Sequence, residues 1–233
     1  MFNAEALLSQ FLGADTQATL NKGKDYISQN AGSLASGAAI GGLGGYMLGS
    51  KNGRKVAKKA ATYGGMALLA GLAYKAYTNY QNPTQNSAQN PNASSPAAND
   101  MSNVPASFQI EAQTGTRSFG ATLISAMIAA AKADGQIDGA EHQAIFSKIE
   151  ELNLDNDEKA FLFDQLNNPV SIDVLVSAAS TKEQAVEIYV ASLVAVDVDT
   201  AAEKAYLSML AARLGLEEDL VNHIHSTIEQ ETS

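Results

Sequence analysis

The sequence predicts an all-α protein that combines a Gly-rich helical hairpin, a disordered linker and a compact bundle of seven helices. Three observations predict this class. Helical periodicity runs through residues 116–233, where no segment has a convincing strand pattern. Four of the five prolines fall in residues 81–115, among Asn, Gln, Ser and Ala, a composition that cannot bury enough apolar surface to fold. Gly and Ala are abundant in residues 1–80, which contain two long runs without charge.

The composition narrows the function classes. The 233-residue chain has no Cys, which excludes disulfides, thiolate zinc sites and cysteine nucleophiles. Its net charge of −10 is unevenly distributed. Residues 1–80 carry eight Lys or Arg and three Asp or Glu (net +5), whereas residues 81–233 carry seven and twenty-two (net −15). We expect the basic region to lie near anionic lipid, and we expect the acidic region to repel nucleic acid.

The first uncharged run, residues 31–50, is long enough for a helix of roughly 30 Å that spans a bilayer. Small residues recur in it at every fourth position and leave one helical face almost free of side chains. This stripe consists of Ser33, Gly37, Gly41, Gly45 and Gly49. Such a small-xxx-small pattern is typical of membrane helices that pack closely together, so the stripe predicts a homo-oligomer.

A basic loop follows, with an Asn-Gly turn signal and five cationic side chains that suit lipid headgroups. These are Lys51, Arg54, Lys55, Lys58 and Lys59. A second uncharged run covers residues 60–74, and Tyr74, Tyr77 and Tyr80 suit a membrane interface. We interpret residues 1–80 as a region with a transmembrane hairpin in a bacterial inner membrane. The positive-inside rule places its basic tip in the cytoplasm and the acidic domain in the periplasm.

Another interpretation of the same residues is a peripheral or soluble helix pair. The many glycines make both runs only weakly hydrophobic, and Gly also lowers helix stability in water. In that case the basic loop would touch lipid without any segment crossing the bilayer.

The third zone is punctuated by capping signals that predict its helix boundaries. Four sequences fit a capping box: Asp138-x-x-Glu141, Asp155-x-x-Glu158, Thr181-x-x-Gln184 and Thr200-x-x-Glu203. Stop signals are Gly135, Asn153, the Asn167-Asn168-Pro169 trio and Gly215. They predict helices at 118–133, 139–151, 156–167, 171–179, 182–196, 201–213 and 217–230. Apolar stripes such as Leu123, Met127 and Ala130 predict one shared core.

Two segments of this zone are similar to each other, and each predicts a helix, an acidic turn and a capped helix. The first reads AKADGQIDGAE (131–141) and the second reads DVDTAAEKAYL (197–207). These turns resemble the TerB-like fold, the all-helical domain named after a tellurite-resistance protein. The Gly-rich hairpin, basic loop and Pro/Asn linker before them resemble the YebE family of uncharacterised inner-membrane proteins.

The resemblance implies a Gram-negative inner-membrane location and a helical domain with acidic residues proposed to bind a divalent metal. It implies no established activity, and the cytosolic location of many TerB-like domains opposes the periplasmic placement. Carried over to this sequence, the acidic set is Asp134, Asp138, Glu141, Asp197, Asp199 and Glu203. Converging carboxylates would need Ca²⁺, Mg²⁺ or Mn²⁺ to offset their repulsion. The competing interpretation is structural: these residues cap helices and complement their dipoles without any ion.

No sequence motif indicates catalysis. The chain has no nucleophile elbow, no His-Glu-x-x-His helix and no phosphate-binding loop. The function we predict is therefore a membrane-anchored, non-enzymatic helical module that binds a divalent metal or a protein partner through its acidic domain. The alternative is a membrane-active structural protein that oligomerises through its glycine-striped helices.

Overall fold

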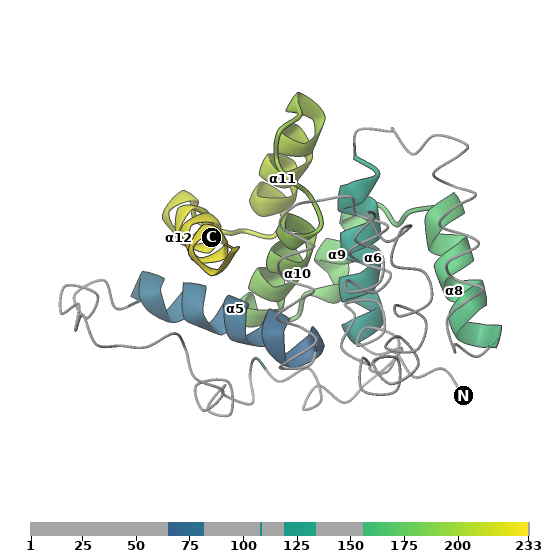
Figure 1. Cartoon of the computed structure of the whole chain (residues 1–233), viewed down its shortest axis with the longest axis horizontal. Coiled ribbons are helices and arrows are strands. Elements are labelled where there is room, and N and C mark those ends of the chain that lie inside the picture. The colour runs from purple at the N-terminus through teal and green to yellow at the C-terminus, as the bar shows by residue number, and fades with distance from the viewer. Residues whose placement is uncertain (1–64, 82–107, 109–118, 134–155, 233) are drawn as a thin grey trace, which may run out of the picture.

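The computed structural model describes residues 65–81, 108, 119–133 and 156–232, and every regular element in these ranges is a helix (Figure 1). The helices are α5 (Gly65–Gln81), α6 (Phe119–Ala131), α8 (Asn156–Asn167), α9 (Ile172–Ala178), α10 (Lys182–Val194), α11 (Ala201–Arg213) and α12 (Glu218–Thr232). The predicted all-α class is confirmed for this part of the chain. The glycine stripe, the basic loop and the predicted helix 139–151 lie outside the described residues.

Helix α10 forms the centre of the bundle. Every residue from position 185 to position 196 is buried, so neighbours cover this helix on all sides. Helices α5 and α12 lie together on one side of α10 and α6 lies on the other, with α8 beyond α6 (Figure 1). Ser192 at the α6 contact donates its hydroxyl to the Ile188 carbonyl at 3.0 Å, which satisfies a polar group inside the core.

Helix α6 is apolar around its whole circumference, which explains its place inside the bundle. Eleven of its thirteen residues are buried. The predicted core residues Leu123, Met127 and Ala130 are all fully buried, so the predicted stripe is confirmed. Just beyond the helix, Lys132 Nζ donates to the Leu166 carbonyl and links α6 to α8.

The predicted capping signals that fall within the described residues set the helix boundaries. Helices α8 and α11 have the predicted bounds. At the start of α11, Thr200 and Glu203 form a reciprocal capping box. At its end, Gly215 adopts φ +67°, and the Leu216 amide donates to the Ala211 carbonyl at 3.0 Å, as in a Schellman motif. Helix α10 ends at Val194, two residues earlier than predicted, shortly before Val198 adopts φ 55°.

Helix α5 differs most from expectation. The sequence interpretation assigned residues 65–80 to the anchor region, whereas the structure packs α5 against α10 and α12 (Figure 1). Its small and apolar face is buried in the shared core; it comprises Leu69, Ala70, Leu72, Ala73 and Ala76. Among the described residues, no helix combines the length and the apolar character needed to cross a membrane.

The chain also returns to α5 after leaving it. Phe108, from the segment predicted as a linker, is buried and stacks edge-on against Tyr74 with ring centroids 5.5 Å apart. Tyr77 lies 5.7 Å from the same ring. Two of the tyrosines predicted to suit a membrane interface therefore contact an aromatic residue of the protein itself.

Candidate functional site

The acidic turn before α11 is the described half of the predicted metal site. Glu203 Oε2 accepts hydrogen bonds from the Thr200 amide at 3.0 Å and from the Thr200 hydroxyl at 2.9 Å. The Thr200 hydroxyl in turn accepts from the Glu203 amide at 3.1 Å. The predicted capping box is thus confirmed for Glu203, which accepts both bonds from Thr200 through one carboxylate oxygen.

The other predicted ligands are not brought together in the part of the chain that the structure describes. Asp199 is exposed and Asp197 is half-buried. Asp134, Asp138 and Glu141 lie outside the described residues. Within the described ranges, no three His, Asp or Glu side chains are grouped so that they could hold a metal ion. Metal binding therefore stays a prediction from the sequence.

A different carboxylate is the most unusual polar group of the bundle. Glu187 lies in the middle of α10 and its relative exposure is 0%. Neither of its carboxylate oxygens has a hydrogen-bond partner among the described residues. Burial raises the pKa of Glu187 to about 8, and the carboxylate of Glu183 one turn earlier raises it as well. Removing a charged carboxylate from water without a partner is so costly that the neutral acid is favoured in the folded state.

One feature of the sequence singles out Glu187, but helical periodicity does not predict that this residue is buried. Glu187 is the only charged residue in the apolar run from position 185 to position 196. The period of a helix alone cannot distinguish a buried acid from an exposed one when the helix is apolar on all sides. Glu187 is buried because four helices pack around α10.

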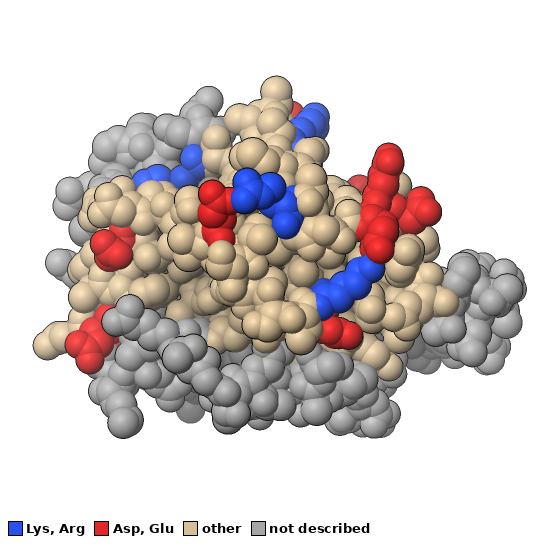
Figure 2. Space-filling model, turned by 180° about the vertical axis from the view of Figure 1, so that it is seen from behind, with Lys and Arg blue, Asp and Glu red and all other residues tan. Residues whose placement is uncertain are grey.

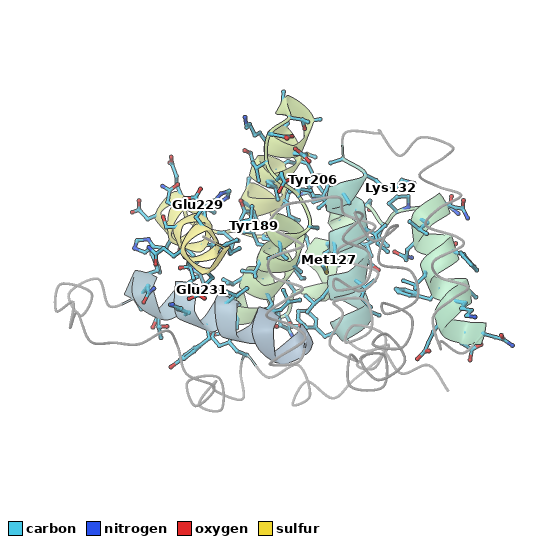
Figure 3. The ribbon with its side chains drawn as sticks, viewed as in Figure 1. Met127, Lys132, Tyr189, Tyr206, Glu229 and Glu231 are labelled. Carbon is cyan, nitrogen blue, oxygen red and sulfur yellow. The ribbon has the colours of Figure 1, made fainter. Side chains whose placement is uncertain are left out.

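The seam between α5 and α12 combines apolar packing with polar contacts. Lys75 Nζ lies 2.6 Å from Glu231 Oε1, and the Glu231 side chain is largely buried (Figure 3). Near the other end of the seam, the rings of Tyr80 and His223 meet edge-on with centroids 5.9 Å apart. The order of these contacts shows that α5 and α12 run antiparallel, and the contacts fix the register of the two helices.

A second polar contact joins α12 to the central helix. The Tyr189 hydroxyl, on a side chain that is only 1% exposed, lies 3.0 Å from His225 Nε2 (Figure 3). Burial lowers the pKa of His225, while the carboxylate of Glu229 acts in the opposite direction. A neutral imidazole is therefore favoured at this position, where Nε2 can accept a hydrogen bond from the tyrosine hydroxyl.

Two ion pairs on the surface join different helices or their ends. Lys182 Nζ lies 2.6 Å from Glu217 Oε2, and Arg213 pairs with Asp173. On the face shown in Figure 2, acidic and basic side chains lie interspersed over the described surface. Such exposed pairs contribute little to stability, so the buried polar groups are more informative about function.

Comparison with known proteins places the chain in a family. A family profile described as "Protein of unknown function (DUF533)" matches residues 33–228. The chain belongs to the DUF533 family. The DUF533 match begins at the first residue of the glycine stripe and ends within α12, so it joins the stripe, α5 and the bundle in one family region.

One relative is similar to part of this DUF533 protein. It is the "uncharacterized protein in ampR 5′ region" of Yersinia enterocolitica, 26% identical over 108 residues, which cover 46% of this chain and 78% of that protein. No solved structure matches the chain. The comparisons support a family of unknown function, and the more specific YebE and TerB-like resemblances stay predictions.

Proposed function

We propose that this DUF533 protein is a non-enzymatic helical module that is attached to the bacterial inner membrane through residues 31–50, with α5 joining the attachment directly to the bundle. The observation that carries the proposal is the packing of α5 against α10 and α12. Helix α5 begins only six residues after Lys59, the last cation of the basic loop. Six extended residues reach about 20 Å, so the bundle stays close to any surface that the loop contacts.

The docked α5 also changes the topology that the charge rule favours. The periplasmic placement assumed that residues 60–74 cross the membrane as a second arm. With α5 packed on the bundle, only residues 31–50 would cross, and the basic loop and the bundle would share one side. The positive-inside rule then favours the cytoplasm for both. The cytosolic location implied by the TerB-like resemblance supports the same side.

The remaining parts of the proposal rest on the sequence. The stripe from Ser33 to Gly49 is the surface for a second copy of the chain, and Lys51, Arg54 and Lys55 are among the cations that meet anionic headgroups. We assign no reaction to the module, because no recognised catalytic motif occurs in the sequence. Its acidic bundle is the part that would bind a protein partner or a divalent ion.

Alkaline-carbonate extraction and protease treatment of spheroplasts test the attachment and its topology together. The cells express the full chain with a C-terminal tag. A chain that stays in the membrane pellet with its tag protected from external protease supports a single crossing. A retained chain whose tag is cleaved overturns the topology, and a chain released by carbonate overturns the membrane attachment.

Cross-linking tests the docking of α5 in the same membranes. Because the chain has no native Cys, Lys75→Cys with Glu231→Cys introduces the only two thiols. A short bifunctional maleimide should join them within one chain and produce a faster-migrating species in denaturing gels. The two single variants are the matched controls. Absence of the intramolecular product, with both thiols reactive toward a monofunctional maleimide, would show that α5 is not docked.

A further inference from the structure

The proposed membrane attachment does not involve the buried Glu187, and the surroundings of this side chain limit what it can do. The side chain is completely removed from solvent, and both oxygens lack a hydrogen-bond partner within the described ranges. Buried carboxylates are rare unless they are paired, bound to a metal or protonated. The first two conditions are not met among the described residues, where no cation or metal-binding group lies against Glu187.

The described helices packed against α10 supply no compensating charge. Helix α6 carries no titratable side chain. The titratable and charged groups of the other three helices are Tyr74, Lys75, Tyr77 and Tyr80 on α5; Glu203, Lys204, Tyr206 and Arg213 on α11; and Glu218, Asp219, His223, His225, Glu229 and Glu231 on α12. Of the described charged groups, only Glu183 acts electrostatically on Glu187, and it disfavours ionisation.

Several of these groups are engaged elsewhere. Lys75 is paired with Glu231, His225 contacts Tyr189, and Glu203 completes the cap of α11. The described part of the protein therefore offers the ionised form of Glu187 neither water nor a partner.

We propose that the closed bundle requires a protonated Glu187, so that release of this one proton opens the packing of α10 against its neighbours. The proposal goes beyond membrane attachment and does not depend on it. Through Glu187, the exposure of the α10 surface and the docking of α5 and α12 depend on pH. Protonation closes the bundle and deprotonation loosens it.

Linkage gives the sign and the pH window. The pKa of Glu187 is about 8 when the bundle is closed, and an exposed Glu has its ordinary value of 4.5. The contribution of Glu187 to the stability of the closed bundle is therefore fully present below about pH 4.5 and is lost as the pH rises to about 8. Over that window the equilibrium constant for opening should rise roughly 100- to 1,000-fold and then level off.

Amide hydrogen exchange of the full chain tests the proposal. Protection factors of the α10 amides, corrected for the intrinsic pH dependence of exchange, are measured between pH 5 and pH 9. We expect them to fall roughly 100- to 1,000-fold in the wild-type protein and to change less than about threefold in Glu187→Gln, which is neutral and nearly isosteric. Glu183→Gln, on the same helix one turn earlier, is the matched control. It should keep the large fall in protection, with the upper midpoint at a slightly lower pH because the carboxylate that disfavours ionisation of Glu187 is lost.

A retained pH profile in Glu187→Gln would overturn the proposal. If that variant does not fold, the wild-type chain still decides the question through the ¹³C resonance of the Glu187 carboxyl carbon. A midpoint well above that of exposed glutamates supports the proposal, and a midpoint near their ordinary value overturns it. Either result is independent of whether the chain is attached to a membrane.

Discussion

Two buried tyrosine hydroxyls differ in whether they have a partner in the described part of the chain. The hydroxyl of Tyr189 lies 3.0 Å from His225 Nε2, whereas the hydroxyl of Tyr206 has no hydrogen-bond partner there. Burial raises the pKa of both phenols to about 12, so both are protonated at neutral pH. The net value of a buried hydrogen bond is modest, but a group left without its partner loses its full solvation. The two sites should therefore respond in opposite ways to the same change.

Tyr189→Phe should lower the free energy of unfolding by about 1–2 kcal/mol, because His225 is left without its partner. Tyr206→Phe removes an unsatisfied hydroxyl and should leave stability unchanged or raise it by about 1 kcal/mol. Urea denaturation at pH 7 measures both. Equal losses in the two variants would contradict the assignment of partners.

At the scale of single helices, a local signal ends α11. Gly215 is the only described glycine with a positive φ, and it closes α11 through the Leu216 amide. A Cβ added at this glycine would meet no atom within 4 Å. Any cost of substitution must therefore come from the left-handed backbone alone and not from a clash.

Gly215→Ala should destabilise the bundle by about 1 kcal/mol through this backbone strain. Gly215→Asn is the matched control, since Asn tolerates the left-handed conformation and should cost less. Thermal unfolding followed by circular dichroism compares the two variants. A larger loss in the Asn variant would show that side-chain volume matters at this turn.

At the scale of the whole molecule, α5 is an integral part of the core. Leu69 is completely buried in the cluster that also contains residues of α10 and α12. The seam with α12 adds the Lys75–Glu231 ion pair and the Tyr80–His223 contact. Loss of packing in α5 should therefore weaken helices that are more than 100 residues away in sequence.

Leu69→Ala should lower the free energy of unfolding of the bundle by about 2–5 kcal/mol, the usual range for a buried leucine. Met209→Ala on α11 is the control, because this large apolar side chain is 53% exposed and its truncation should cost little. Denaturant unfolding with a probe in α12 reports both values. Similar small losses in the two variants would mean that α5 does not stabilise the bundle.

Sequence patterns predicted much of the bundle because the relevant signals are local. The Thr200–Glu203 box and the glycine after Leu214 set the bounds of α11 within one turn of chain, whatever the rest of the protein does. The same box left the role of Glu203 open between capping and metal binding. Only the observed bonds showed that Glu203 caps α11 through one of its carboxylate oxygens.

The sequence by itself determined the all-α class of the described residues, the bounds of α8 and α11 and the buried stripe of α6, because caps and apolar periodicity act over a few neighbouring residues. Tertiary structure alone decided where α5 lies and that Glu187 is buried without a partner among the described residues. An uncharged run such as residues 60–74 is equally compatible with lipid and with a protein core, since both are apolar surroundings. Only the contacts of α5 with distant helices distinguish the two.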